Sequence, residues 1–201
     1  FKQKTAYEIG VRLVGSEMCI RDRDAARLER LVRRLLELAR ADVMQASTTN
    51  RTSLATAIER LATRYQATGL PVTVIEPLPP AVVAMAEEVL DSILSNLFDN
   101  ARQHGGDRVT VSVSCPMPEA GTDPFALIEV SDNGPGMSAA NAARVFEPFF
   151  TTKRAATHVG LGLAMVQEVV NEQRGVIRLD PDCVTGCRWR VSLPIRHVDG
   201  S

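Results

Sequence analysis

The chain has 201 residues, of which 45% are hydrophobic and 23% charged, and its formal net charge is −1. That length suits one domain with an added segment, and the near-neutral charge gives no bias toward nucleic acid. No apolar run reaches the roughly 18 residues of a membrane-spanning helix, so the sequence predicts none. Cys183 and Cys187 lie close in sequence, but no second pair and no nearby histidine completes a zinc site. Free thiols in a reducing cytosol are therefore favoured.

The first 53 residues divide into three segments. Residues 1–23 follow neither a helical nor a strand period and resemble a translated sequencing-adaptor or assembly artefact, with an irregular N-terminal segment as the alternative. On the first interpretation the natural protein is longer than this chain. Residues 24–47 predict a helix whose apolar stripe is wide enough to need more than one partner surface, as in a helical bundle. The polar residues 48–53 break that period and predict a linker.

The remaining sequence alternates between helical and strand periods. Apolar residues at three- and four-residue steps predict helices at 54–65, 87–104 and 160–174, and a shorter one at 139–145. Gly69, Gly105 and Gly175 are expected to end the three longer helices. Alternation of apolar and polar residues predicts strands at 109–114, 126–132, 176–179 and 187–193, the last two as a hairpin. Another strand is predicted to begin at Val72 and to be closed by Pro77, Pro79 and Pro80. Residues 196–201 are expected to form a tail.

The helix at 87–104 carries an unusual polar stripe. Ser92, Asn96, Asn100 and His104 recur at four-residue steps on one face. Asn is a poor helix former, so a purely solvated stripe would more often contain Glu, Lys or Gln. The carboxamide oxygen is a hard ligand that suits Mg²⁺. Taken alone, the helix is equally consistent with a surface that happens to carry two Asn residues.

Three further motifs follow that helix. DNGPGM begins at Asp132, which continues the apolar face of its strand, and an inward carboxylate is costly unless it binds something. FEPFFTTK occupies 146–153, and GLGL at 160–163 opens the next helix. Each motif alone is weak, because DNG is often only a turn and GxG before a helix is common. The Asn-bearing helix and these three motifs in this order, within about 75 residues, are a strong signal.

In these four elements the chain resembles the catalytic ATP-binding domain of bacterial sensor histidine kinases. Their superfamily includes DNA gyrase, the ninety-kilodalton heat-shock chaperone and the mismatch-repair ATPases. The resemblance spans about residues 53–195, and residues 24–47 resemble, less specifically, the second helix of a dimerisation hairpin. It implies an α+β fold, a two-layer α/β sandwich in which helices cover one face of a mixed sheet. The ATP-binding domain would occupy residues 54–195.

The resemblance also implies roles for individual side chains. Asn100 would ligate the Mg²⁺ that bridges the ATP phosphates. Asn96, a candidate for nucleotide binding and catalysis, stands where the hydrolysing relatives carry a Glu general base. Because Asn cannot take a proton from water, phosphoryl transfer to a protein is favoured over ATP hydrolysis. Asp132 would accept a hydrogen bond from the adenine amino group.

Other implied roles concern the phosphates and the loops around them. Lys153 would act in catalysis as a cation at the γ-phosphate. Phe146 and Phe149 would anchor a mobile lid, with a plain core role as the alternative. Gly134 and Gly136 would let the backbone close around the base and sugar. Backbone N–H groups for the phosphates would come from the residues at the start of the last helix, which are Gly160, Leu161 and Gly162.

The sequence departs from the family pattern at three points. His158 and Val159 replace the Gly-Thr that usually precedes GLGL, which puts nucleotide affinity in doubt. Arg174 replaces the first of two glycines that usually end the following helix. No acceptor histidine followed by an acid is present, since His104, His158 and His197 all lie in or after the ATP-binding domain. The chain is therefore expected to bind ATP without phosphorylating itself.

The resulting interpretation is a fragment of a sensor histidine kinase. With ATP and Mg²⁺ it would phosphorylate a histidine of the dimerisation hairpin, for relay to an aspartate of a response regulator. The full-length protein would form a homodimer through that hairpin, and no nucleic acid partner is expected. The domain would be cytoplasmic, and an inner-membrane anchor in the full-length protein stays open. The alternatives are an anti-sigma-type serine kinase, which the 24–45 helix disfavours, and a non-catalytic nucleotide-binding module.

Overall fold

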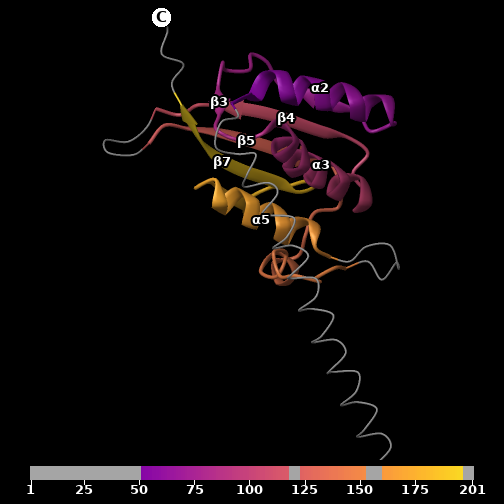
Figure 1. Ribbon diagram of the computed structural model, residues 1–201. Helices are drawn as coiled ribbons and strands as arrows, with labels where there is room; N and C mark the ends of the chain where they lie inside the picture. Colours follow the sequence, from indigo (N-terminus) through magenta and orange to yellow (C-terminus); the bar gives the residue numbers. More distant parts are fainter. Residues whose placement is uncertain (1–50, 118–122, 153–159, 197–201) are drawn as a thin grey trace, which may run out of the picture. The chain divides into compact units, whose positions relative to one another are not determined.

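The computed structural model describes residues 51–117, 123–152 and 160–196, which form a seven-stranded mixed sheet with helices on one face (Figure 1). The strand order is β1-β3-β7-β5-β4-β2, and β6 also pairs with β7. Among these residues every pairing is antiparallel except that of β2 with β4. The strands are β1 (Thr52–Ser53), β2 (Val72–Val74), β3 (Val82–Val83), β4 (Val109–Ser114), β5 (Phe125–Asp132), β6 (Val176–Leu179) and β7 (Arg188–Arg196).

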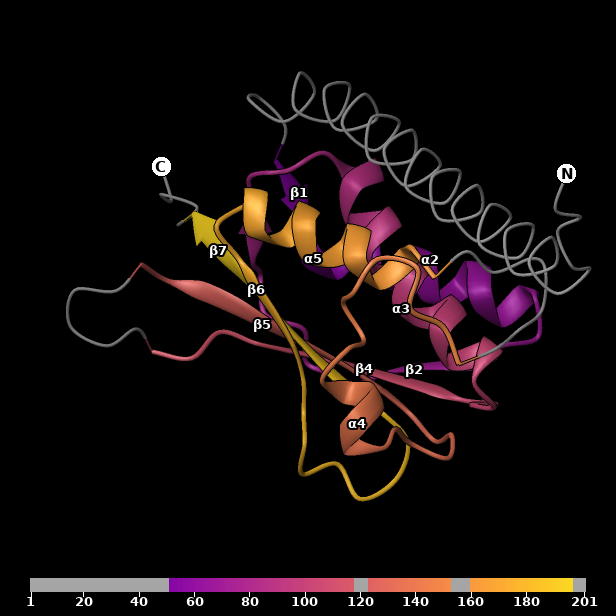
Figure 2. The same ribbon diagram turned by 90° about the horizontal axis from the view of Figure 1, so that it is seen from below.

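The three longer helices lie on the same side of the sheet, as Figures 1 and 2 show. They are α2 (Leu54–Ala67), α3 (Glu87–Gln103) and α5 (Gly162–Glu172). A single-turn helix, α4 (Ala139–Ala142), lies in sequence between β5 and α5. This arrangement confirms the predicted α+β sandwich of one mixed sheet and one helical layer.

The core lies between α3 and the inner face of the sheet. Leu94 and Phe98 on α3 are 0% exposed, in agreement with the apolar steps of the sequence. Alternate residues of the strands face them, and Val111, Ile128 and Val191 are also 0% exposed. Burying one side chain of this size contributes about 1.5–3 kcal/mol. The shared core therefore fixes the position of α3 over β4, β5 and β7.

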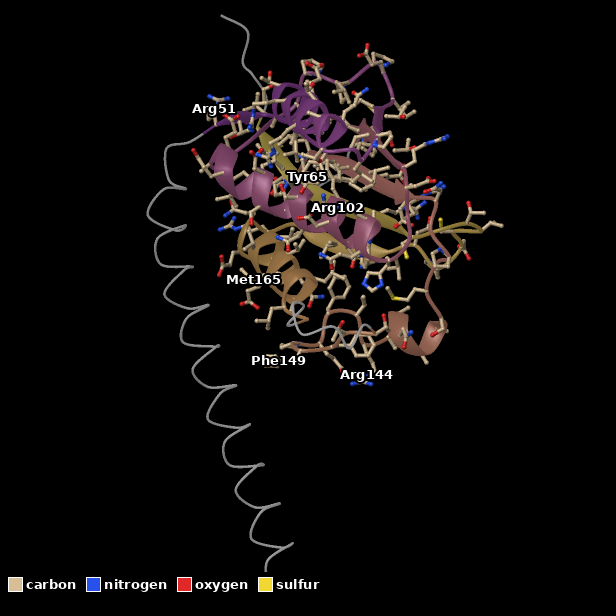
Figure 3. All side chains as sticks on the ribbon, turned by 90° about the vertical axis from the view of Figure 1, so that its right-hand side faces the viewer. Arg51, Tyr65, Arg102, Arg144, Phe149 and Met165 are labelled. Carbon is tan, nitrogen blue, oxygen red and sulfur yellow. The ribbon has the colours of Figure 1, made fainter. Side chains whose placement is uncertain are left out.

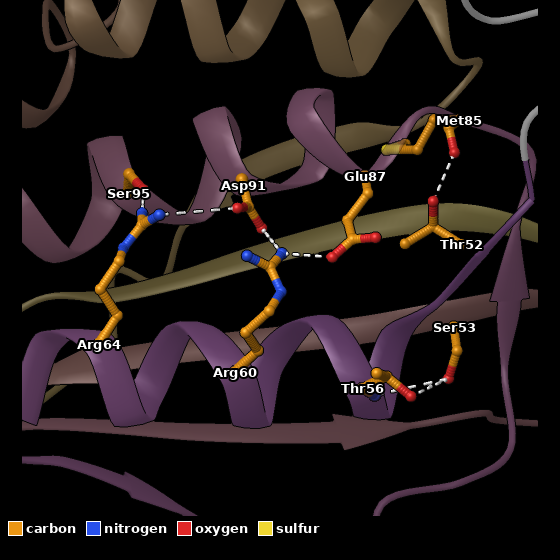
Figure 4. Close-up of polar contacts among 9 residues, drawn as sticks. All are labelled: Thr52, Ser53, Thr56, Arg60, Arg64, Met85, Glu87, Asp91 and Ser95. Atoms are coloured by element: carbon orange, nitrogen blue, oxygen red, sulfur yellow. Dashed lines mark hydrogen bonds and ion pairs between the residues drawn. The ribbon is translucent and has the colours of Figure 1, made fainter.

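Polar contacts join α2 to α3 along their exposed edge (Figure 4). The Arg60 guanidinium lies 2.6 Å from the Glu87 carboxylate and donates a hydrogen bond of 2.7 Å to Asp91. Beneath this edge the Tyr65 and Phe98 rings meet edge-on, with their centroids 5.1 Å apart. Because exposed ion pairs contribute only about 0–1 kcal/mol, the aromatic contact and the core hold the two helices together.

A residue with positive φ follows each longer helix: Gly69 (86°), Gly105 (93°) and Arg174 (58°). The left-handed conformation costs a non-glycine residue roughly 1–2 kcal/mol, so Arg174 is strained. The predicted glycine ends are confirmed for α2 and α3. At α5 the turn residue is Arg174, and Gly175 is required for a different reason. A Cβ at Gly175 would lie 2.4 Å from the Ser192 carbonyl oxygen.

Two short strands differ from the sequence prediction. Thr52 and Ser53 belong to the expected linker, yet they form β1 against β3, and no strand was expected at β3 itself. The Thr52 hydroxyl donates a hydrogen bond of 2.7 Å to the Met85 carbonyl oxygen. A strand of two residues has no detectable period, so its position follows from tertiary pairing, here of Val83 with Ile195 on β7.

Several predicted segments lie outside the described residues. They are the segments 1–23 and 24–47, residues 48–50 of the predicted linker, and residues 197–201 of the predicted tail. β7 continues to Arg196, beyond the predicted strand end at 193. Within the described ranges, no helix combines the length and the apolar character needed to cross a membrane.

Candidate functional site

A cleft of about 410 Å³ lies between α3, the segment after α4 and the start of α5. Figure 3 shows Met165 on α5, together with Arg144 and Phe149 on the segment that leads to it. The predicted site residues that line this cleft are Asn96, Asn100, Gly160, Leu161 and Gly162. Asp132, Gly134 and Gly136 do not line it, although the neighbouring Met137 does. Lys153 lies outside the described residues.

Asn96 lines the cleft and lies close to Gly162 at the start of α5. Its side-chain amide donates a hydrogen bond of 2.8 Å to the Ser92 carbonyl oxygen one turn earlier on α3. A Cβ at Gly162 would lie 2.6 Å from Asn96 Oδ1. Any side chain at position 162 would therefore displace either Asn96 or the N-terminal turn of α5. The GLGL motif thus lets the first turn of α5 approach the Asn-bearing face of α3.

Asn100 lies one turn farther along α3 and is half-buried. Its side chain has no hydrogen-bond partner among the residues that the structure describes. Within the same described ranges, no group of three acidic, histidine or cysteine side chains could hold a metal ion. Mg²⁺ often takes only one or two protein ligands and completes its shell with phosphate oxygens and water. The free carboxamide of Asn100 fits that kind of site.

The Asp132 carboxylate ends β5 on the inner side of the sheet and is half-buried. Its Oδ1 accepts hydrogen bonds from the backbone N–H of Gly134 at 2.9 Å and of Cys187 at 3.2 Å. The backbone N–H of Asp132 donates in turn to the Cys187 carbonyl oxygen at 2.9 Å. Both bonds to the carboxylate use the same oxygen, and within the described ranges Oδ2 accepts no hydrogen bond.

Gly186 also neighbours Asp132, although no sequence pattern predicted this contact. It has a φ of 70°, and a Cβ there would lie 1.8 Å from the Asp132 carbonyl oxygen. A Cβ at Gly134 would lie 2.9 Å from Asp132 Oδ1, and one at Gly136 would lie 3.0 Å from the Gly186 carbonyl oxygen. These glycines pack the DNGPGM turn against the loop between β6 and β7. The only signal for Gly186 in the sequence is an ordinary turn pattern, Thr-Gly, between two strands.

The nearby Cys187 thiol is held in its neutral form. Burial raises its pKa to about 11, and the negative charges of Asp132 and Cys183 add to the shift. Cys187 is 8% exposed. At neutral pH this thiol is therefore protonated and packs as a small apolar group beside Asp132.

A backbone hydrogen bond connects the segment after α4 to the residue that precedes the start of α5. The backbone N–H of Phe149 donates to the Gly160 carbonyl oxygen at 2.9 Å, and both residues have positive φ, 66° and 69°. A Cβ at Gly160 would lie 2.7 Å from the Phe150 carbonyl oxygen. Phe146 packs edge-on against Trp189 with centroids 6.0 Å apart. The Phe146 ring and the Phe149 backbone N–H thus hold this segment in place, while the lid role of the two residues stays a prediction.

Comparisons with known proteins identify the family of this chain. The family described as histidine kinase-, DNA gyrase B- and HSP90-like ATPase matches residues 85–197. The sensor histidine kinase ZraS of Salmonella typhimurium strain LT2 is 31% identical over 176 residues, which is 86% of this chain and 36% of ZraS. The sensor protein IrlS of Burkholderia pseudomallei is 32% identical over 166 residues, 78% of this chain and 34% of IrlS. The chain thus spans about a third of the length of these curated relatives.

Solved structures share the fold. The mycobacterial sensor histidine kinase MprB is similar with a TM-score of 0.60 and 26% identity, covering 73% of this chain and 99% of the MprB chain. The ATP-binding domain of PrrB from Mycobacterium tuberculosis is similar with a TM-score of 0.59 and 22% identity, covering 73% and 97%. The sandwich fold is therefore shared with these histidine kinase structures.

Proposed function

The chain belongs to the family of histidine kinase-, DNA gyrase B- and HSP90-like ATPases, and we propose that it is the ATP-binding catalytic region of a sensor histidine kinase. One observation carries the proposal. α3 brings Asn96 and Asn100 to the floor of a cleft whose opposite wall is the glycine-rich start of α5. Because the chain spans only about a third of its curated relatives, the acceptor, the partners and the overall activity belong to the proposal.

The phosphates of the nucleotide would bind at the N-terminus of α5. Leu161 precedes the first helical residue and offers no capping side chain, and the first turn contains no acidic residue. Free backbone N–H groups and the helix dipole favour an anion at this position. Gly160, Leu161 and Gly162 line the cleft there, so their backbone is within reach of a bound phosphate chain.

Asn100 would hold Mg²⁺ together with the phosphates. The ion neutralises charge on the transferred group, and the protein contributes the position of its ligand. The half-buried carboxamide of Asn100 has no competing partner in the described part of the chain, so it is available for this task. Lys153 remains the proposed cation at the γ-phosphate.

Asp132 would select adenine. Its carboxylate is pre-oriented by two backbone N–H groups, and an ionised carboxylate only accepts hydrogen bonds. Adenine presents an amino group at the position where guanine presents a carbonyl oxygen, and that oxygen would face the carboxylate as a second acceptor. A guanine nucleotide would thus lose a hydrogen bond and leave two acceptors in contact.

Transfer to a protein would dominate over hydrolysis, because Asn96 cannot act as a general base. Its amide is already engaged with the Ser92 carbonyl oxygen, which makes it a positioning group in the cleft. Phosphoryl transfer needs mainly positioning and charge neutralisation, which the cleft can supply. The acceptor would be a histidine of a dimerisation hairpin, followed by relay to a response regulator. The domain would act in the cytoplasm.

Calorimetric titration of the 201-residue chain with a non-hydrolysable ATP analogue tests nucleotide binding. We expect binding that is strengthened by Mg²⁺ and is at least about tenfold weaker for the matching GTP analogue. Circular dichroism on the same sample establishes that the protein is folded. A folded protein without affinity for the ATP analogue would overturn the proposal.

Phosphoryl transfer is tested by fusing the chain to a dimerisation hairpin that contains an acceptor histidine. Incubation with radiolabelled ATP should give acid-labile protein label, and replacing the acceptor histidine with Gln should remove it. Steady release of inorganic phosphate without labelled protein would instead indicate an ATPase. Nucleotide binding with neither labelled protein nor phosphate release would indicate a non-catalytic module.

A further inference from the structure

Asn133 follows Asp132 in the DNGPGM turn and is not among the residues that line the α3–α5 cleft. We propose that it is a positioning residue for adenine selection, because its side chain connects the Asp132 turn to the loop between α3 and β4. The inference rests on the proposed function, in which Asp132 contacts the adenine amino group. It goes beyond that function by assigning part of the selectivity to a second side chain, which acts through Asp132.

The Asn133 side chain makes three hydrogen bonds to two adjacent residues of that loop. Its Oδ1 accepts from the backbone N–H groups of Asp107 and Arg108, each at 3.1 Å. Its Nδ2 donates to Asp107 Oδ1 at 2.7 Å. Because the Asp107 carboxylate is charged, this third bond belongs to the stronger class of hydrogen bonds. A single side chain therefore sets the spacing between the loop and the Asp132 turn.

These bonds begin where the backbone pairing of β4 with β5 ends. The final pair at this end of the ladder is Val109 with Asp132. Arg108 and Asn133 are the next residues on the two segments, and there the Asn133 side chain takes the place of a backbone acceptor. The ends of strands open more readily than their central residues. The Asn133 side chain thus holds the end of β5, which carries Asp132, against the start of β4.

The loop that Asn133 holds is packed directly against Asp132. A Cβ at Gly106 would lie 3.2 Å from Asp132 Cβ, and one at Gly134 would lie 3.2 Å from the Gly106 backbone nitrogen. The Gly106 N–H donates in turn to the Ala101 carbonyl oxygen at 2.9 Å, in the last turn of α3. Since closely packed segments transmit small displacements, a shift of this loop would also shift the Asp132 carboxylate.

Removing the Asn133 side chain should affect adenine selection more than it affects the fold. Asn133 and Asp107 are both exposed, so neither contributes to the core. A hydrogen bond to a charged group that is displaced but not abolished should cost about three- to tenfold in affinity. A guanine nucleotide does not make the bond to Asp132, so its affinity should stay the same and the preference for adenine should fall by the same factor.

The test is calorimetric titration of the 201-residue chain and its variants with the ATP and GTP analogues in the presence of Mg²⁺. Asn133→Ala should bind the ATP analogue about three- to tenfold more weakly and the GTP analogue about as well as the unsubstituted chain. In an Asp132→Asn background the same substitution should cause no further loss of preference, because it acts through Asp132. Urea denaturation should give nearly the same midpoint for Asn133→Ala and the unsubstituted chain.

An exchange of the two side-chain types between positions 133 and 107 is the matched control. Asn133→Asp alone keeps an acceptor for the two backbone N–H groups but places two carboxylates side by side, so it should also lower the preference for adenine. Adding Asp107→Asn should restore the preference to within about twofold, since the new amide at position 107 can donate to the new carboxylate at position 133.

Three results would overturn this inference and leave the proposed function intact. They are an unchanged preference in Asn133→Ala, an equal loss of affinity for both analogues in that variant, and a double variant that prefers adenine no more than Asn133→Asp alone. A further loss of preference in the Asp132→Asn background would overturn it as well. A folded, unsubstituted chain without affinity for the ATP analogue would instead refute the proposed function, and this inference with it.

Discussion

The Asp132 turn and the α3–α5 cleft hold their polar groups in contrasting ways. Asp132 is surrounded by backbone, with two N–H groups on one carboxylate oxygen and glycines packed at distances that no side chain tolerates. In the cleft, Asn100 is half-buried and has no side-chain partner among the described residues. The first region is built for fixed geometry and the second leaves room for a variable ligand shell. The proposed ligands differ in the same way, because a planar base needs fixed partners and a metal–phosphate group needs room for water and phosphate oxygens.

The largest expected effect is a loss of stability in Gly186→Ala, which alters the packing around the Asp132 turn. The new Cβ would collide with the Asp132 carbonyl oxygen, so the loop must move. We expect the free energy of unfolding to fall by about 3 kcal/mol or more, measured by urea denaturation. Gly69→Ala is the matched control, since Gly69 also has positive φ but no atom within 4 Å of the added Cβ. It should cost only about 1 kcal/mol. Equal losses would show that the close approach at Gly186 is unimportant.

Asp132→Asn tests the proposed adenine contact and leaves the packing of the Asp132 turn unchanged. Asn can still accept the two backbone hydrogen bonds through Oδ1, but an NH₂ donor replaces the second carboxylate oxygen. That donor would face the adenine amino group, so we expect affinity for the ATP analogue to fall about 10- to 100-fold. Calorimetry should also show reduced preference over the GTP analogue. Unchanged affinity and selectivity would remove Asp132 from the proposed adenine site.

Asn100→Ala tests the proposed Mg²⁺ site in the α3–α5 cleft. The proposed Mg²⁺ ligand disappears while the fold loses little, because this side chain has no partner in the described part of the chain. We expect the strengthening of nucleotide binding by Mg²⁺ to fall at least about tenfold, with stability changed by no more than about 0.5 kcal/mol. Ser92→Ala, on the same face of α3 but outside the residues that line the cleft, should leave the Mg²⁺ effect intact. An intact Mg²⁺ effect in Asn100→Ala would contradict the assignment.

The smallest expected effect lies far from both regions, at the end of α5. Arg174 has a φ of 58°, a conformation that glycine adopts without strain. Arg174→Gly should therefore raise the free energy of unfolding by roughly 0.5–1 kcal/mol, because the relieved strain exceeds the added flexibility of the unfolded chain. Affinity for the ATP analogue should not change. A loss of stability would mean that the Arg174 side chain makes a compensating contribution.

Much of this arrangement follows from local sequence pattern. The 3.6-residue period of α3 places Asn96 and Asn100 on one face, and the alternation in β5 directs Asp132 inward. The glycines at 160 and 162 also mark the approach of α5 to α3. Each of these features depends on residues within a few positions of one another. Over such short distances the regular geometry of a helix or strand fixes the direction in which each side chain points. The assignments of Lys153, of the adenine contact and of Mg²⁺ stay predictions.

Local periodicity was thus enough to predict the longer helices and strands and their buried faces, and the four motifs indicated the family of the chain. What holds Asp132 in place is visible only in the folded protein, because Cys187 donates to it across 55 positions of sequence and Gly186 packs beside it. The same holds for β1 and β3, whose two-residue lengths are too short for a period, and for the Asn96–Gly162 contact. Such contacts depend on how segments that are distant in sequence pack together. The space between their backbones decides which side chains fit, and a local sequence pattern carries no information about that space.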